Sequence, residues 1–181
     1  MNDYIVLLRG INVGGKNKMP MVDLKKCLEE LGFTEVVTYI ASGNVILKSQ
    51  KKPAKIQSQI EKALPKQFQI DSKLIKVLVL TDSQLKTVVS QKPGRFGEQP
   101  EKYHSDVIFL INLSLTQALS VFDPRKDIDK IWPGEGVIYS QRLSSQRSKS
   151  RLNKIVGTTA YKNMTIRNWN TVTKLLEMVN G

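Results

Sequence analysis

The sequence predicts an α+β fold of two ferredoxin-like (split βαβ) halves packed together, with antiparallel sheets covered by helices. Apolar spacing and turn residues in the first 80 residues predict the order strand, helix, strand, strand, helix, strand. Much the same order recurs after residue 81, although the halves share no sequence identity that we can detect. We therefore expect halves at residues 1–80 and 81–181, the second with a C-terminal helix, forming one compact unit.

Local signals define the elements of the first half. Gly32 ends a helix with one apolar face, because glycine readily adopts the left-handed conformation found just after a helix. Ser42-Gly43-Asn44 is typical of a tight turn between two strands, and Pro53 suits a first helical position. These signals predict strands at residues 4–9, 36–40, 45–48 and 74–80, and helices at 21–31 and 53–64.

The second half contains more chain-breaking residues. Thr81 or Asp82 is expected to cap a helix, and prolines and glycines predict a loop over residues 92–105. The segment Trp132-Pro-Gly-Glu-Gly136 predicts a turn between two short strands. The predicted elements are helices at 82–89, 116–122, 148–156 and 168–179, and strands at 106–111, 128–131 and 137–139.

Basic residues exceed acidic ones by 28 to 16, which gives a net charge of +12 and favours polyanionic partners. No acid occurs between Glu135 and Glu177, and arginine, serine and glycine alternate there, which favours a functional phosphate-binding patch. No acid occurs between Glu35 and Glu61 either, but the lysines at positions 48–55 are interpreted as a solvated surface.

The chain has one cysteine and no apolar run near the roughly 20 residues that a membrane span needs. Cys27 cannot form an internal disulfide, and its place on the apolar face of a helix indicates a core residue. We therefore expect a cytoplasmic protein with no membrane partner.

The most informative segment runs from a buried strand into a glycine-rich loop. Residues 10–16 fit the G-x-x-x-x-G-K spacing of a P-loop, but Asn17 stands where Ser or Thr would bind magnesium, and the next helix begins too late. We therefore favour a simpler anion site, in which backbone N–H groups and cations face one phosphate. Alternatively, the glycines only shape a turn and Arg9 pairs with a carboxylate such as Asp23. The candidate residues are Arg9, Gly10, Asn12, Gly14, Gly15 and Lys16.

A second candidate segment precedes the last helix. Arg167 is expected beside the N-terminus of that helix, where the dipole already favours negative charge, so a cation there suggests a bound anion. Asn168 or Thr165 is expected to cap the helix. We expect Arg167 and Arg9 to converge on one pocket; alternatively, Arg167 points into solvent.

Two further stretches complete the candidate site. The basic, hydroxyl-rich segment at residues 144–151, which includes Arg147, either clamps a phosphate backbone or is a mobile connection, and both interpretations stay open. Ser42 and Asn44 join the site if the tip of their hairpin folds over the glycine loop.

Composition excludes several chemistries. His104 is the only histidine and Cys27 the only cysteine, so a Cys/His zinc cluster is impossible. His104 falls in the predicted loop at 92–105 without a nucleophile elbow, so a Ser-His-Asp triad is not indicated. Residues 45–48 lack the aromatic pattern of an RNA-recognition motif. We expect no metal and no cofactor, and the sequence indicates no catalytic residue.

Three motifs resemble the bacterial family called domain of unknown function 1697: Leu7-Leu-Arg-Gly-Ile-Asn-Val-Gly-Gly15, Ser42-Gly-Asn44, and Arg167-Asn-Trp169 with Thr171-Val172. The resemblance spans essentially the whole chain. It implies two similar ferredoxin-like α+β halves with the C-terminal helices exchanged between them, and it implies no established activity. The polar motifs of the family match Arg9, Gly10, Asn12, Gly14, Gly15, Ser42, Gly43, Asn44, Arg167, Asn168 and Trp169, and treating them as a site is our own inference.

Three functional hypotheses follow. The leading one is binding of a phosphate-bearing ligand, with nucleic acid favoured: Arg9 and Lys16 supply charge, the glycine loop supplies N–H donors, and Arg167 closes the site. The second is an enzyme acting on a small anionic metabolite, for which no catalytic base is apparent. The third is a protein interaction module in which the motifs are packing devices. The oligomeric state is left open.

Overall fold

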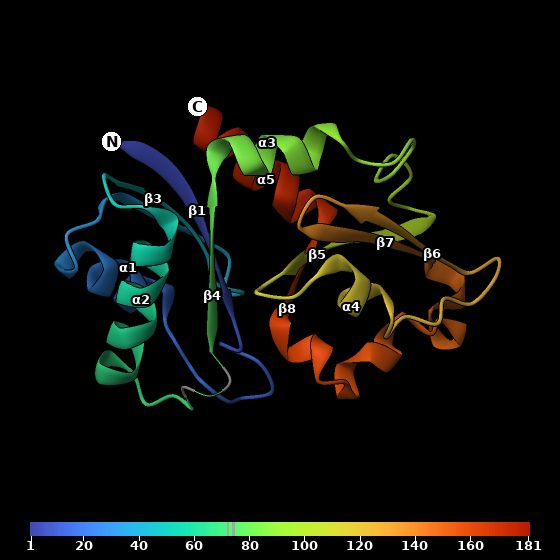
Figure 1. Ribbon diagram of the computed structural model, residues 1–181, viewed down its shortest axis with the longest axis horizontal. Coiled ribbons are helices and arrows are strands. Elements are labelled where there is room, and N and C mark those ends of the chain that lie inside the picture. The colour runs from blue at the N-terminus through green and yellow to red at the C-terminus, as the bar shows by residue number, and fades with distance from the viewer. Residues whose placement is uncertain (72, 74) are drawn as a thin grey trace. The chain divides into compact units, whose positions relative to one another are not determined.

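Two four-stranded antiparallel sheets organise the chain, as the predicted α+β class requires. The computed structural model describes residues 1–71, 73 and 75–181 (Figure 1). The chain divides into an N-terminal unit, residues 1–85 with 175–181, and a C-terminal unit, residues 86–174. Both boundaries fall inside helices, α3 (Asp82–Ser90) and α5 (Trp169–Asn180).

The N-terminal unit has the ferredoxin-like topology predicted from its element order. Its sheet order is β2-β3-β1-β4, with every neighbouring pair antiparallel. The predicted strand at 74–80 begins at Lys76, and residue 74 lies outside the described residues. The elements are β1 (Asn2–Arg9), α1 (Met21–Glu30), β2 (Thr34–Tyr39), β3 (Asn44–Ser49), α2 (Pro53–Gln67) and β4 (Lys76–Thr81).

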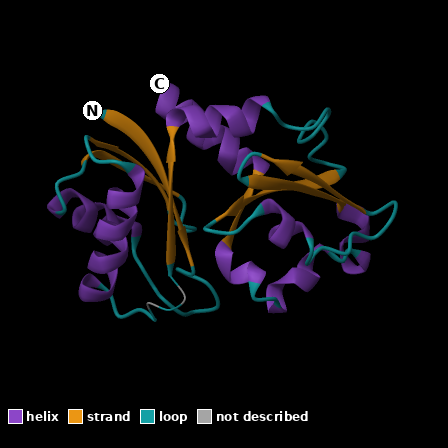
Figure 2. Ribbon diagram, viewed as in Figure 1, coloured by secondary structure: helices purple, strands orange, loops and turns teal. Residues whose placement is uncertain are grey.

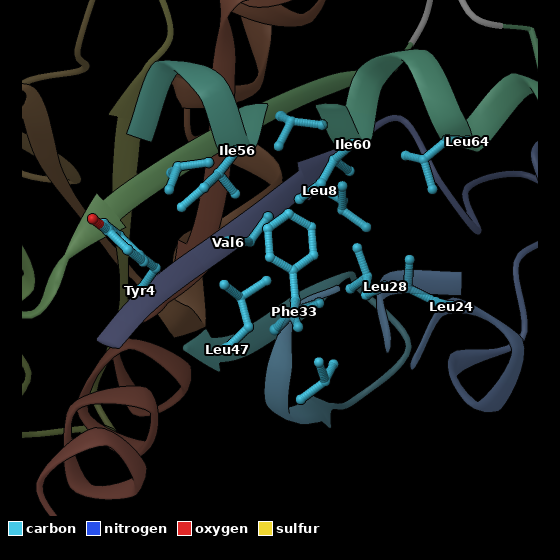
Figure 3. Close-up of a cluster of buried hydrophobic side chains, with 14 of the residues drawn as sticks. Tyr4, Val6, Leu8, Leu24, Leu28, Phe33, Leu47, Ile56, Ile60 and Leu64 are labelled. Atoms are coloured by element: carbon cyan, nitrogen blue, oxygen red, sulfur yellow. The ribbon is translucent and has the colours of Figure 1, made fainter. Parts of the chain in front are cut away.

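Helices α1 and α2 cover one face of this sheet (Figure 2). Alternate residues of β1 point toward them, because successive side chains of a strand face opposite sides. Figure 3 shows Ile56, Ile60 and Leu64 of α2 directed toward this strand. The buried cluster includes Tyr4, Val6, Leu8, Leu24, Leu28, Phe33, Val45, Leu47, Ile56, Ile60, Leu64, Val77 and Val79.

Gly32 ends α1 as predicted. It has φ +84°, its N–H donates to Glu29 O (2.9 Å), and the N–H of Phe33 donates to Leu28 O (3.3 Å). This pair of bonds is the Schellman arrangement, which pairs carbonyls that the helix leaves without an intrahelical partner. Helix α2 continues beyond the predicted end at residue 64 to Gln67, with Pro65 inside its last turn.

The C-terminal unit repeats the same strand order, β6-β7-β5-β8, with antiparallel neighbours throughout. A capping box begins α4, in which Ser114 Oγ accepts from the N–H of Gln117 (3.2 Å). Short 3-10 turns stand where the N-terminal unit has its second helix. The elements are β5 (Tyr103–Leu110), α4 (Leu115–Leu119), β6 (Asp129–Gly134), β7 (Val137–Leu143), η1 (Ser144–Lys149), η2 (Leu152–Gly157), η3 (Ala160–Asn163) and β8 (Met164–Asn168).

Four predictions for this unit need correction. The loop at 92–105 ends earlier, since β5 already begins at Tyr103. The expected turn at 132–136 shortens to Glu135 and Gly136, because β6 is an edge strand and an edge tolerates Pro133. The helix expected at 148–156 is replaced by η1 and η2. The helix expected from residue 168 begins at Trp169, and the strand β8, which the sequence does not predict, precedes it.

The core of the C-terminal unit lies on both faces of its sheet. One face contacts α4, η2 and η3 through Ile108, Leu110, Ala118, Ile138, Ile155 and Met164. On the other face, Phe96 makes edge-to-face contacts with Tyr139 and Trp169, both with ring centroids 5.3 Å apart.

Among the described residues, no helix combines the length and the apolar character that crossing a membrane requires.

Candidate functional site

The glycine loop after β1 folds back on itself as a small hairpin. The N–H of Asn12 donates to Asn17 O and the N–H of Lys16 donates to Val13 O, each at 3.0 Å. Gly14 and Gly15 form the turn, with φ of +58° and +75°, which glycine adopts without strain. A P-loop would lead directly into a helix from its lysine, whereas here α1 begins only at Met21. This loop therefore does not have the geometry of an ATP-hydrolysing P-loop.

The two asparagines of this loop hold its backbone in place. The side chain of Asn12 donates to the carbonyls of Met19 and Ala41, both at 2.9 Å, and accepts from the N–H of Met19 (2.7 Å). Asn17 is buried, donates to Gly10 O (2.8 Å), and accepts from the N–H of Asp71 (2.8 Å). The amide of Asn12 is therefore occupied with structural bonds rather than presented to a ligand.

The turn between β2 and β3 lies against the glycine loop, as the sequence hypothesis required for Ser42 and Asn44. Leu8 N–H donates to Gly43 O (2.8 Å), and Asn12 bonds to the neighbouring Ala41. Asn44 is fully buried and donates to Tyr39 O (3.0 Å) and to Ser42 Oγ (2.9 Å). This turn is therefore brought beside the loop, where its side chains stabilise the turn.

Arg9 and Lys16 are the cations predicted at this loop. Arg9 is half-buried at the end of β1, directly opposite Lys76 of β4 in the antiparallel register. Two like charges in such a pair repel each other, and a nearby anion reduces this repulsion. Lys16 is exposed at the hairpin. Lys76 is therefore a further cation at this end of the sheet, beside Arg9.

Arg167 is buried within β8 rather than exposed to solvent, with only 6% of its surface accessible. Its Nη1 donates to Thr165 Oγ1 (2.8 Å) and to Ile166 O (2.9 Å). Burial lowers the pKa of Arg167 to about 10, because removal from water disfavours the charged form. Arg167 and Arg9 belong to different units, so their convergence on one pocket stays a prediction.

Asn168 caps α5, as predicted, since its Oδ1 accepts from the N–H of Asn170 (3.1 Å). Its side chain also donates to Ser105 O (3.2 Å) on β5. Asn168 and Arg167 are consecutive residues of one strand, so their side chains point to opposite faces of the sheet. The two candidate residues therefore do not share a pocket within the C-terminal unit.

His104 and Asp106 form a pair that the sequence interpretation missed. They stand two residues apart on β5 and share one face, and His104 Nε2 donates to Asp106 Oδ2 (3.0 Å). Burial raises the pKa of the Asp106 carboxyl, against the opposing effects of His104, Arg142 and Asn168. The His-x-Asp spacing is the available signal, and the predicted loop over residues 92–105 hides it because alternate residues share a face only in a strand.

His104 lines a pocket of about 190 Å³ at the start of α5. The pocket is mostly polar and is lined by Gly97, Pro100, Tyr103, His104, Ser105, Asn168, Trp169 and Asn170. With Nε2 donating to Asp106, the neutral ring keeps Nδ1 as a proton acceptor. A histidine oriented by a carboxylate is a common general base, so this pocket has the groups for proton transfer.

Arg147 lies in the basic loop, exposed on η1. A shallow hollow of about 600 Å³ is lined there by Ser144, Ser145, Arg147, Ser148, Ser150 and Asn153. Buried Asp129 anchors the loop, because its Oδ2 accepts from the backbone N–H of the loop residue Arg151 (2.8 Å). The same oxygen accepts from the backbone N–H of Arg125 (2.9 Å), which lies outside the loop. Arg151 in turn forms an ion pair with Asp123 (2.8 Å).

The candidate residues thus form separate groups. The glycine loop and the Ser42–Asn44 turn meet in the N-terminal unit, whereas Arg147, Arg167 and Asn168 occupy three different environments of the C-terminal unit. Within the described parts of the chain, no three His, Cys, Asp or Glu side chains gather as a metal ion would require.

Comparisons with known proteins identify the family. The solved structure of a conserved bacterial protein from Streptococcus pneumoniae has a TM-score of 0.83 to this chain, with 25% sequence identity over 98% of both chains. No curated protein matches the sequence. The family model described as "Protein of unknown function (DUF1697)" matches residues 1–139, which include the first two of the three motifs. The resemblance inferred from the motifs is confirmed, and the chain belongs to the DUF1697 family.

Proposed function

We propose that this protein binds a phosphate-bearing ligand, with nucleic acid favoured, and that the hollow of the basic loop is its main contact. The observation that carries the proposal is the lining of that hollow. Four serines, Arg147 and Asn153 surround it, and all of them offer hydrogen-bond donors. The lining residues include no carboxylate, so a phosphate there meets donors and positive charge.

The segment at residues 144–151 is anchored to the rest of its unit, which favours a clamp on a phosphate backbone over a mobile connection. Asp129 accepts from the backbone N–H of Arg151 in this loop, and Arg125 Nη1 donates to Lys149 O (3.4 Å). A loop held in one conformation loses less entropy on binding than a free one. Arg151 forms an ion pair with Asp123. We therefore expect Arg147 and Lys149 to be the cations that contact phosphate.

A polymer is favoured over a small phosphate ligand because the positive charge extends along the chain. The net charge is +12, and no acid interrupts the sequence between Glu135 and Glu177. Lysine and arginine bind a polyanion largely by releasing its counterions, so affinity falls as salt rises. A cytoplasmic location, where nucleic acid is abundant, is part of this proposal.

Fluorescence anisotropy with labelled single-stranded RNA, single-stranded DNA and duplex DNA tests the proposal. The variant Arg147→Ala/Lys149→Ala is compared with Lys25→Ala/Lys26→Ala, which removes the same charge from exposed positions of α1. We expect the slope of log affinity against log salt to fall by about 2 for the loop variant only, since each lost phosphate contact removes about 0.9. Absent binding at low salt, salt-independent binding, or equal losses in both variants would contradict it.

A second candidate function, an enzyme acting on a small anionic metabolite, is favoured by the His104–Asp106 pair. This pair supplies the base that the sequence did not indicate, beside a pocket at the N-terminus of α5. Because the chain has a single histidine, its imidazole proton resonance reports this pocket directly. Titration with inorganic phosphate and with acetate is expected to shift that resonance in the wild type and less in Asn170→Leu; an unchanged resonance removes this candidate.

A further inference from the structure

The lysines of α2 line a groove that neither the proposed phosphate contact nor the histidine pocket uses. The groove has a volume of about 600 Å³ and lies within the N-terminal unit, between the C-terminal end of α1 and the length of α2. Lys51, Lys55, Lys62 and Lys66 line it, together with Cys27, Glu30, Leu31, Ser58, Gln59, Ala63 and Gln67. The sequence alone predicts a solvated surface for the first lysines of this group.

Three of these lysines form one stripe along α2. Lys55, Lys62 and Lys66 are spaced i, i+7 and i+11, which places them within about 40° of one another around the helix axis. The stripe is about 16 Å long, at 1.5 Å per residue. Glu61, the acid of α2, is directed elsewhere, since its Oε1 accepts from the N–H of Val77 on β4 (3.2 Å). The helix therefore presents positive charge to the groove.

The fourth lysine is held in position by its neighbours. Lys51 Nζ donates to Gln59 Oε1 (2.6 Å) and stands 5.3 Å from the centre of the Phe33 ring. Gln59 donates in turn to Leu31 O (2.9 Å) at the end of α1. This chain of contacts joins the two helices at one end of the groove and fixes a cation there, which reduces the entropy lost on binding.

The side chains around the lysines are both apolar and polar. Cys27, Leu31 and Ala63 contribute apolar surface, and Ser58, Gln59 and Gln67 contribute neutral polar groups. Among the described residues of the lining, Glu30 is the one carboxylate. A nucleic acid strand prefers arginine and aromatic platforms on which its bases stack, and this lining contains neither. A cationic stripe beside the apolar surface of Cys27, Leu31 and Ala63 instead matches a helix that has acids on one side and aliphatic residues beside them.

We infer that this groove docks an acidic amphipathic helix of a partner protein. A partner helix that runs beside α2 in the same direction presents residues with the same repeat, so its acids spaced i, i+7 and i+11 lie opposite Lys55, Lys62 and Lys66. Aliphatic residues next to those acids face Leu31 and Ala63. The interaction surface belongs to the N-terminal unit and is independent of the phosphate-binding proposal, whose residues lie in the C-terminal unit.

Two labelled helical peptides of identical composition test this inference by fluorescence anisotropy. The matched peptide carries glutamates at i, i+7 and i+11 with leucines beside them, and the shifted peptide has the same residues distributed around the helix. We expect a Kd on the order of 10 μM for the matched peptide and binding at least about tenfold weaker for the shifted one. Equal affinities, or no binding of the matched peptide up to about 1 mM, overturn the inference.

Charge reversal locates the contact. Lys62→Glu is expected to weaken binding of the matched peptide by about tenfold or more, whereas Lys18→Glu, which changes the net charge equally at an exposed position off the groove, leaves it nearly unchanged. Equal losses in both variants would show non-specific attraction and overturn the inference. Circular dichroism confirms that each variant is folded, and Arg147→Ala/Lys149→Ala is expected to bind the peptide normally.

The single thiol supplies an internal reporter. Cys27 is the only cysteine and lines the groove, but it is buried, and burial raises the pKa of its thiol, so a neutral maleimide labels this one site slowly. Saturating matched peptide is expected to slow this labelling several-fold, and shifted peptide is not. Preferential binding of an oligonucleotide, or a dimer of the protein that Lys62→Glu abolishes, would assign the groove to another occupant and overturn the inference.

Discussion

Substitution of Gly43 by alanine separates packing from ligand binding in the motif between β2 and β3. Gly43 has φ +78°, and a Cβ added there would stand 2.8 Å from Leu8 Cβ and 2.7 Å from Ile11 Cδ1. The Ile11 contact involves the end of a flexible side chain. The Leu8 contact cannot relax easily, because the Leu8 N–H donates to Gly43 O (2.8 Å) and fixes the two backbones together.

The expected loss of stability has two parts. A left-handed conformation costs an alanine about 1–2 kcal/mol, and overpacking of a filled site costs about 1–3 kcal/mol. Their sum, about 2–5 kcal/mol, is a large fraction of the 5–15 kcal/mol by which a typical domain is stable. Gly14 supplies the matched control, since its φ is +58° and no atom lies within 4 Å of its added Cβ, so only the first cost applies.

Urea denaturation followed by far-ultraviolet circular dichroism measures both variants. This signal reports the helices and strands of both units, whereas tryptophan fluorescence would report only Trp132 and Trp169 in the C-terminal unit. With a denaturant slope of about 2–3 kcal/mol per molar, we expect the Gly43→Ala midpoint to fall by about 1–2 M. Equal destabilisation by Gly43→Ala and Gly14→Ala would refute the argument that close packing against Leu8 requires this glycine.

Three further predictions concern the C-terminal unit. Gly97→Ala is expected to destabilise at least as much as Gly43→Ala, because φ is +77° and the added Cβ would overlap the indole ring of Trp169; tryptophan fluorescence during urea denaturation measures this. Ser114→Ala removes the cap of α4 and should cost about 1 kcal/mol in thermal unfolding, while Ser114→Thr retains most of it. Asp106 has a raised pKa because of burial, so its ionised form is less stable in the folded chain, and its contribution to stability is lost as pH rises through that pKa. Asp106→Asn should therefore match the wild type near about pH 3 and exceed it at about pH 7 in urea denaturation, and a variant that is weaker at neutral pH would contradict this sign.

Most of the fold could be predicted because its elements have clear periodicity. Strand β1 alternates toward the helices, α2 repeats its apolar residues at helical spacing, and Gly32 ends α1, all of which are local signals. Strand β8 is hard to predict because two of its three buried positions are the polar Thr165 and Arg167, beside Met164, while the apolar Ile166 is exposed.

The candidate site was harder to predict because a polar residue in a loop or turn can either bind a ligand or hydrogen-bond the backbone of its own unit. Asn12 and Asn44 match the polar motifs, yet their amides bond backbone carbonyls of the same unit. Spacing along the chain cannot show this, because Met19, Ala41 and Tyr39 become their partners only in the folded unit. The pairing of His104 with Asp106 depended likewise on the start of β5, the least certain feature of a predicted strand.

These two uses of polar residues can be separated by experiment, because they change different quantities. Asn12→Ala removes three hydrogen bonds that hold the loop, so it should lower stability by about 1–3 kcal/mol and leave the salt dependence of nucleic acid binding unchanged. Arg147 is exposed beside the serine-lined hollow, so Arg147→Ala should reduce the salt slope and leave the urea midpoint unchanged. If instead Asn12→Ala changed the slope without lowering stability, the glycine loop would be the anion site and its amide bonds would be incidental to the fold.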